Sequence, residues 1–303
     1  MRWRKLGRIF CGAGEFPWME SYAGVPFAEQ IDGDFYRIYF TSRDAHNRSH
    51  VGWVEIDINR PDRVLRLSER PILSPGEAGS FDDAGTTLSC VVRHGERRHF
   101  YYIGWSLRRS VPYHLAIGLA FASGDSGAPT LDRLAGPIID RNRIDPLFCT
   151  APFVMVEDGR WRVWYVSGLG WVNAGREVVP AYNTRYAESS DGVDWTRTGL
   201  VVRDPQGDEF GFSRPSILFD GGAYHMWCSV RGRNQPYRLE HARSQDGLAW
   251  TRDDDGSGLE TSASGWDSEM ITYPHVFDHG GDRYMLYCGN GYGKTGFGIA
   301  VLT

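Results

Sequence analysis

Three acidic residues offer the first candidate chemistry in this sequence. Glu20, Asp83 and Glu269 each lie five or six residues before a proline or serine that opens an apolar segment. Two carboxyls held about 5–5.5 Å or about 6.5–9.5 Å apart can cleave a glycosidic bond, since one acts as the acid and the other as nucleophile or base. We treat these three residues as candidate catalytic acids. The alternative for each is a carboxylate that only caps a surface loop.

A second set of residues has the chemistry to bind a ligand. Arg214 and Tyr273 stand directly before two of those prolines, and an arginine can hold a carboxylate or phosphate by two parallel hydrogen bonds. Trp171 offers an aromatic face to a sugar ring. An ion pair between Arg214 and Glu209, and a core position for His275, are the alternatives. The candidate substrate-binding residues are Arg43, Asp44, Trp171, Glu209, Arg214, Arg231, Tyr273 and His275.

A repeat in the sequence predicts the elements that position these residues. Five segments combine a short apolar strand, a turn rich in Gly and Asp, and an aromatic strand, and a third strand follows each of them. Such a regular period is typical of a fold built from repeated units. The second residues of the segments lie 63, 63, 63 and 59 residues apart, at Pro26, Ser89, Pro152, Pro215 and Pro274.

Two of the units continue through a tight turn into a fourth strand. Asp191-Gly192 and Asp246-Gly247 supply the positive φ angles that such a turn needs. The fourth strands begin at Trp195 and Trp250. We expect each of these tryptophans to pack between neighbouring units.

The final unit has no room for a fourth strand before the sequence ends. The N-terminal segment 3–10 resembles segment 195–202, so we expect it to complete the final unit and close a ring. The prediction is an all-β fold, a single five-bladed β-propeller over residues 1–303 with four-stranded blades. An open β-solenoid is the alternative. In a propeller, the loops before the first strands and after the second strands meet on one face, where ligand groups converge.

One acidic position recurs and is therefore a poor candidate for catalysis. A residue type found in nearly every unit is better explained by a structural role, such as accepting hydrogen bonds from loop N–H groups. The residues at this position, seven before the proline or serine, are Met19, Asp82, Asp145, Asp208 and Asp267.

Composition narrows the class of protein. A net charge of −5 argues against a nucleic-acid-binding scaffold. The five cysteines show no CxxC spacing, which predicts free thiols in a reducing compartment. We find no signal-peptide pattern and no apolar run of about 18 residues, so we expect a cytoplasmic protein without a membrane partner. We predict no cofactor, while an axial calcium and the oligomeric state stay open.

Several segments resemble the five-bladed propeller glycosidases, a group that includes arabinanases and xylosidases, invertases and levansucrases, and mannoside phosphorylases. They are AESSDGVDWTR, ARSQDGLAWTR, GSFDDAGTTLSCVV, FSRPSILFDGGAYHMW and ITYPHVFDHGGDRYMLY. The resemblance covers essentially the whole chain and implies the propeller fold and a carbohydrate substrate. Those families place catalytic acids at the starts of the first strands. The matching positions here read GVP, TLS, TAP, SRP and TYP, which hold no acid.

Three functional hypotheses follow from the residues and the resemblance. The first is a glycosidase-like enzyme that acts on a small glycoside or oligosaccharide, with Glu20, Asp83 and Glu269 as its acids. The second is a phosphorylase, transferase or other tailoring enzyme of polysaccharide or natural-product biosynthesis. The third is a carbohydrate-binding propeller without catalysis. We lean towards an enzyme because the resembling families cleave or transfer glycosyl groups.

Overall fold

The computed structural model describes residues 1–123, 129–174, 177–233, 236–253 and 256–303. The described residues form strands and one short helix, α1 (Asn290–Gly293), so the all-β prediction is confirmed. All five cysteines are free. No helix in the described ranges has the length and apolar character that crossing a bilayer requires.

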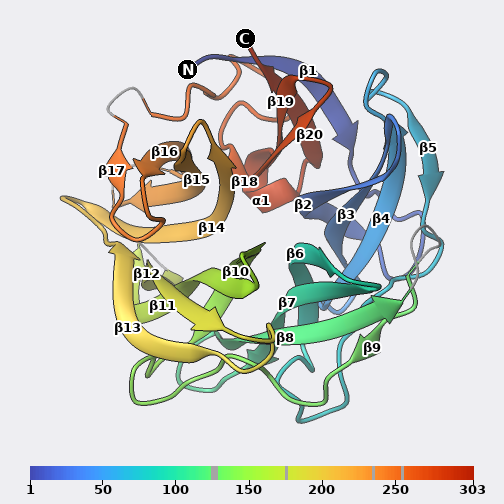
Figure 1. Cartoon of the computed structure of the whole chain (residues 1–303). Coiled ribbons are helices and arrows are strands. Elements are labelled where there is room, and N and C mark those ends of the chain that lie inside the picture. The colour runs from blue at the N-terminus through green and yellow to red at the C-terminus, as the bar shows by residue number, and fades with distance from the viewer. Residues whose placement is uncertain (124–128, 175–176, 234–235, 254–255) are drawn as a thin grey trace.

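The strands form five groups of four antiparallel strands, called units I to V, which are arranged around a common centre (Figure 1). A single parallel bridge, Ser49 with Gly85, joins units I and II into one sheet, and another, Tyr182 with Gly211, joins units III and IV. Unit I contains β2 (Ser21–Asp32), β3 (Phe35–Arg43), β4 (Ser49–Asp57) and β5 (Val64–Leu67). Unit II contains β6 (Gly85–His94), β7 (Arg97–Leu107), β8 (Tyr113–Ser123) and β9 (Asp132–Arg133). Unit III contains β10 (Cys149–Glu157), β11 (Arg160–Ala174), β12 (Glu177–Ser189) and β13 (Thr196–Arg203). Unit IV contains β14 (Glu209–Asp220), β15 (Ala223–Gly232), β16 (Arg238–Ser244) and β17 (Thr251–Arg252).

Unit V draws its strands from both ends of the chain. It contains β18 (Thr272–His279), β19 (Asp282–Cys288) and β20 (Phe297–Leu302), and its outer strand is β1 (Trp3–Phe10), which pairs antiparallel with β20. The backbone N–H of Thr303 donates to the carbonyl oxygen of Arg2 at 2.9 Å, and the two termini lie together in Figure 1. An apolar cluster joins residues of unit V, such as Leu286 and Phe297, to residues of unit I, such as Phe40. The last unit therefore packs against the first.

The Asp-Gly turns bind each outer hairpin to the preceding unit. The Tyr101 hydroxyl in unit II donates to the Gly192 carbonyl at 2.9 Å, and the Trp164 indole in unit III donates to the Gly247 carbonyl at 2.7 Å. Gly192 and Gly247 have φ of 76° and 75°, a region that favours glycine. Trp195 packs against Tyr101 with ring centroids 6.4 Å apart, which confirms that this tryptophan lies between units.

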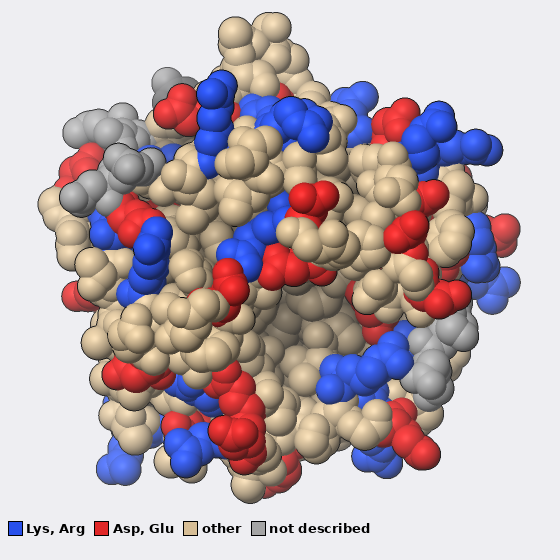
Figure 2. All heavy atoms as spheres, turned by 45° about the horizontal axis from the view of Figure 1, so that its top comes forward, with Lys and Arg blue, Asp and Glu red and all other residues tan. Residues whose placement is uncertain are grey.

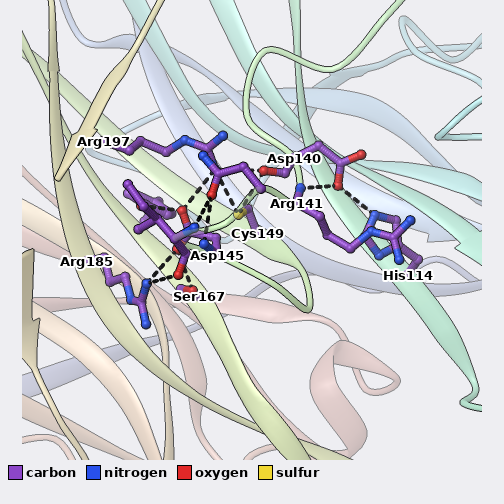
Figure 3. Close-up of polar contacts among 11 residues, drawn as sticks. His114, Asp140, Arg141, Asp145, Cys149, Ser167, Arg185 and Arg197 are labelled. Atoms are coloured by element: carbon purple, nitrogen blue, oxygen red, sulfur yellow. Dashed lines mark hydrogen bonds and ion pairs between the residues drawn. The ribbon is translucent and has the colours of Figure 1, made fainter. Parts of the chain in front are cut away.

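Three of the four recurring aspartates, Asp82, Asp145 and Asp267, are structural, as the sequence predicts, and each binds a cation from the outermost strand of its own unit. Asp145 accepts hydrogen bonds from Arg197 on β13 at 2.9 Å, from Arg185 at 3.0 Å and from Ser167 at 2.7 Å (Figure 3). Units II and V repeat the arrangement in the ion pairs Asp82–Arg133 and Asp267–Lys5.

Units I and IV depart from this pattern in different ways. In unit IV the predicted Asp208 is exposed, and the adjacent Glu209, whose side chain is 3% exposed, pairs with Arg252 on β17 instead. In unit I Met19 replaces the acid, and the outer strand supplies Leu67, which belongs to the same apolar cluster. Each cation is in register with an alanine, whereas Leu67 is in register with Val54; the alanines are Ala120, Ala187, Ala242 and Ala300.

Candidate functional site

All five units contribute to one cavity of about 550 Å³. Its position among the first strands agrees with the predicted convergence of loops at the centre of the fold, and one face of the molecule is hollowed near its centre (Figure 2). The lining is mainly aromatic and aliphatic, with hydroxyl groups and three arginines. The lining residues used below are Tyr22, Arg43, Trp105, Tyr113, Tyr182, Arg214, Arg231, Tyr237, Tyr273 and Tyr292.

A bulge at the start of the first strand directs side chains into this cavity. The strand pairing is interrupted at the prolines that mark the repeat, and the residue before each of four prolines has a positive φ. These residues line the cavity, with φ of 54° at Val25, 46° at Ala151, 51° at Arg214 and 55° at Tyr273. A non-glycine residue rarely adopts this conformation, and the residue before proline favours extended backbone. Four such strained positions at one cavity mark it as a candidate functional site.

Unit II lacks the bulge with a positive φ, and comparison with the other units shows how the bulge affects the direction of a side chain. Leu88 precedes a serine instead of a proline, has no positive φ and is fully buried outside the cavity lining. The interruption of pairing there spans only Leu88 to Cys90. The wider bulge before proline therefore re-aims a side chain towards the centre, as bulges commonly do.

The three arginines of the lining carry no carboxylate partner among the described residues. Arg214 is buried and donates from Nη2 to the carbonyl oxygens of Pro26 at 2.8 Å and Ser89 at 3.3 Å. Arg231 donates to the carbonyl oxygen of Pro180 and lies over the rings of Tyr182, Tyr237 and Phe210. Arg43 lies 4.3 Å from the centroid of the Tyr22 ring and donates to the side chain of Asn47. These arginines make the cavity positive.

Tyrosine hydroxyls supply most of the remaining polar groups. Those of Tyr182 and Tyr237 are hydrogen-bonded to each other. Burial raises the pKa of Tyr113 to about 12, so its hydroxyl stays protonated at neutral pH and can donate a hydrogen bond. The cavity thus offers neutral donors and cations to a ligand.

The three predicted catalytic acids do not line the cavity, so they do not converge there as we expected. Glu20 and Glu269 are exposed, and Asp83 is half-buried with its carboxylate accepting the backbone N–H of Gly79 at 3.0 Å. Among the described residues that line the cavity there is no Asp or Glu. The Asp83 carboxylate is held within its own loop, whereas the backbone N–H groups of Glu20 and Glu269 donate to the Arg43 carbonyl and to the Asn290 side chain. The spacing of the acids along the chain does not reveal these hydrogen bonds.

Of the predicted substrate-binding residues, Arg43, Arg214, Arg231 and Tyr273 line the cavity and four others do not. Asp44 accepts hydrogen bonds from the backbone of His46 and from the side chains of Arg48 and His50. Glu209 forms ion pairs with Arg238 and Arg252. The ion pair between Arg214 and Glu209, which the sequence offered as an alternative to ligand binding, is therefore not formed.

The last two predicted residues lie behind the lining. Trp171 packs edge-on against Tyr113, with centroids 5.3 Å apart, and does not itself line the cavity. His275 is buried, and its ring stacks on Phe27 at 4.0 Å between centroids. His275 is therefore a core residue, the alternative that its sequence context left open.

Sequence reasoning missed the tyrosines that dominate the lining. Tyr22 and Tyr113 stand near strand starts, and Tyr237 and Tyr292 lie in segments that leave second strands, so their positions in the repeat are the signal that could have identified them. No group of three or more His, Cys, Asp or Glu in the described ranges is placed to hold a metal ion.

The fold and site place the chain in a known structural class. No family model matches the chain. The structure is similar to that of BT0996 in an RGII complex, with a TM-score of 0.76, 20% identity and coverage of 98% of this chain and 90% of that protein. A thermostable family-43 glycoside hydrolase has a TM-score of 0.67, 16% identity and coverage of 95% and 90%. Sucrose-6-phosphate hydrolase from Lactobacillus gasseri has a TM-score of 0.66, 13% identity and coverage of 96% and 61%.

These likenesses define a β-propeller of the type found in glycoside hydrolases, as the sequence resemblance implies. The chain is also 44% identical, over 303 residues, to the uncharacterized proteins Rv1502 and MT1551 of two Mycobacterium tuberculosis strains, H37Rv and CDC 1551. The match covers 100% of this chain and 99% of each relative. The chain belongs to the family of these mycobacterial proteins.

Proposed function

We propose that the chain is a five-bladed propeller enzyme that binds a small saccharide in its axial cavity and cleaves or transfers a glycosyl group there. The observation that carries this proposal is the cavity itself, which receives side chains from all five units and combines aromatic faces with hydroxyl donors. Apolar walls with a few placed polar groups are typical of small-molecule sites. Sugar rings present both apolar faces and hydroxyls to such walls.

The structural neighbours support an enzyme of glycosidase type. Several of them are glycoside hydrolases by name, and one is a hydrolase of a phosphorylated sugar. Their identity to this chain is between 13% and 20%, so they support the reaction class and leave the substrate to experiment.

The cavity favours transfer or phosphorolysis over hydrolysis by paired carboxyls. Hydrolysis of that kind requires an acid and a base or nucleophile on either side of the bond, and no carboxyl lines this cavity in the described residues. Hydrolysis through Glu20, Asp83 and Glu269 remains the second candidate, since these acids lie in the loops before first strands. Binding without turnover is the third.

A panel of aryl glycosides and natural oligosaccharides, assayed with and without phosphate, separates these candidates. Turnover that requires phosphate or a sugar acceptor supports transfer. Turnover in water alone that is abolished by Glu269→Gln and Asp83→Asn supports hydrolysis. Binding of an intact sugar with no product in any condition supports the third candidate, and neither binding nor turnover across the panel contradicts the proposal.

A cavity variant tests where the sugar binds. Trp105 lines the cavity from β7, and Trp105→Ala should weaken saccharide binding about tenfold, since loss of a buried aromatic contact commonly costs that much. Leu107, two residues further along the same strand, is 75% exposed, and Leu107→Ala is the matched control. Equal affinities for the two variants in calorimetry would place the sugar elsewhere.

A further inference from the structure

Arg214 lies where the first strands of three units meet. It belongs to β14, lines the cavity and is 3% exposed. Its Nη2 donates to carbonyl oxygens of β2 in unit I and β6 in unit II. The guanidinium therefore reaches across the centre of the molecule.

Arg214 differs from the other buried arginines in having no carboxylate partner. Arg37, Arg98, Arg162 and Arg203 are also buried, and each forms an ion pair with a glutamate. The Nη1 of Arg214 is buried without a hydrogen-bond partner in the described residues. Burial of a cation costs free energy unless the cation is paired and hydrogen-bonded. The Nη1 group of Arg214 is therefore suited to donate a hydrogen bond to a bound anion.

The rest of the cavity reinforces this charge. Arg231 and Arg43 line it without ion pairs to the described carboxyls, and no described Asp or Glu is in the lining. Burial lowers the pKa of Arg214 to about 10, so the guanidinium remains a cation at neutral pH. A cavity whose charges all have one sign raises the local concentration of ligands of the other sign.

We propose that the saccharide bound in this cavity is acidic, and that Arg214 holds its carboxylate or phosphate group through Nη1. This inference rests on the proposed function, because it names the class of saccharide that the cavity takes. Arg231 and Arg43 add charge from the surrounding wall, while the tyrosines contact the sugar. A guanidinium hydrogen bond to an anion is stronger than a neutral hydrogen bond, so the acidic group dominates recognition.

Calorimetric titration with matched sugar pairs tests the proposal. The pairs are glucose with glucuronate, galactose with galacturonate, and glucose with glucose 6-phosphate, and inorganic phosphate is titrated alone. We expect at least one acidic member to bind about ten- to a hundredfold more tightly than its neutral partner, the range of a hydrogen bond to a charged group. Arg214→Met should remove that advantage.

The possible outcomes separate this proposal from the function on which it rests. If neutral and acidic sugars bind equally, the acidic-saccharide proposal is wrong and the saccharide function stands. If inorganic phosphate binds and no sugar does, the anion site stands and the saccharide function fails. If no probe binds at millimolar concentration, both fail.

Because Arg214 also contacts two backbone carbonyls, Arg214→Met is first checked for its circular dichroism spectrum and unfolding midpoint. If it does not fold, two other measurements decide. Arg231→Met should lower the advantage of the acidic sugar severalfold, and the Arg214 guanidinium nitrogen resonances of the wild-type protein should shift when the acidic sugar is added. An unchanged Arg214 resonance at saturating ligand overturns the proposal.

Discussion

At the residue scale, His275 shows how burial fixes the state of a titratable group next to the cavity. Burial lowers its pKa to about 3, and the Arg214 cation acts in the same direction, so the imidazole is neutral in the folded protein. In the unfolded chain the pKa is about 6.5. Because the unfolded state binds the proton more readily, His275 costs no stability above about pH 6.5 and progressively lowers stability as pH falls from there towards 3.

His275→Phe should therefore flatten the pH dependence of stability on the acid side. The ring stacking on Phe27 is retained, while the proton uptake on unfolding is lost. Between pH 6 and 4 the free energy of unfolding of the wild type should fall more steeply than that of the variant, by up to about 1.4 kcal/mol per pH unit. Urea unfolding at a series of pH values measures both slopes, and parallel slopes would contradict a neutral, buried imidazole.

At the scale of elements, the acid and cation pairs anchor each outer strand to the loop that enters its unit. Asp267 accepts hydrogen bonds from Lys5 at 2.6 Å and from the Tyr287 hydroxyl at 3.1 Å. In unit I the corresponding residues Met19 and Leu67 belong to one apolar cluster, so apolar residues stand there in place of the ion pair. Replacement of a buried pair by apolar residues is often neutral, whereas loss of one partner costs about 3–5 kcal/mol.

The Asp267–Lys5 pair of unit V can be replaced by methionine and leucine, the residues at the corresponding positions of unit I. Asp267→Met alone should destabilise the protein by about 3 kcal/mol, because Lys5 loses its anion. Adding Lys5→Leu should restore part of the loss, so the double variant is more stable than the sum of the single changes predicts. Urea unfolding of the four proteins measures the coupling, and additive effects would show that the two residues act separately.

The Asp-Gly turns allow a second test at this scale. A Cβ at Gly247 would lie 2.6 Å from Nη2 of Arg162 and 2.9 Å from Trp164, whereas a Cβ at Gly159 would meet nothing within 4 Å. Both glycines have φ of 75°. Gly159→Ala should cost about 1–2 kcal/mol for the backbone alone, and Gly247→Ala should cost more because the clash adds to it. Equal unfolding midpoints would mean that the turn does not touch the neighbouring unit.

At the scale of the whole molecule, β1 lies at the start of the chain, whereas the other strands of the unit that it completes lie at the end of the chain. Because Thr303 is hydrogen-bonded to Arg2, a circularly permuted chain can carry residues 1–11 after Thr303, joined by a short linker. In that chain β20 and β1 would form a hairpin with the same antiparallel pairing. A chain that begins at Gly12 and carries residues 1–11 after Thr303 should keep the wild-type circular dichroism spectrum. Deletion of residues 1–10 should expose the edge of β20 and produce an unfolded or aggregated protein. A stable, soluble deletion variant would contradict the structural role of β1.

The sequence by itself determined the strands, the repeat and the pairing partner of the N-terminal segment, because strand periodicity and turn chemistry are local properties. It also indicated Arg43, Arg214, Arg231 and Tyr273 as residues at the centre, since each holds a fixed position relative to a repeated strand. The recurrence of Asp82, Asp145 and Asp267 correctly indicated structure instead of catalysis.

Only the tertiary structure decided which side chains enter the cavity. Glu20, Asp83 and Glu269 stand at suitable distances along the chain, yet their loops turn them away from the lining. Tyr22, Tyr113, Tyr237 and Tyr292 enter it from four different units. The direction of a side chain at the centre depends on contacts between units. Arg214, for example, contacts Pro26 and Ser89, which lie 188 and 125 residues away along the chain. Spacing within one unit carries no information about such contacts.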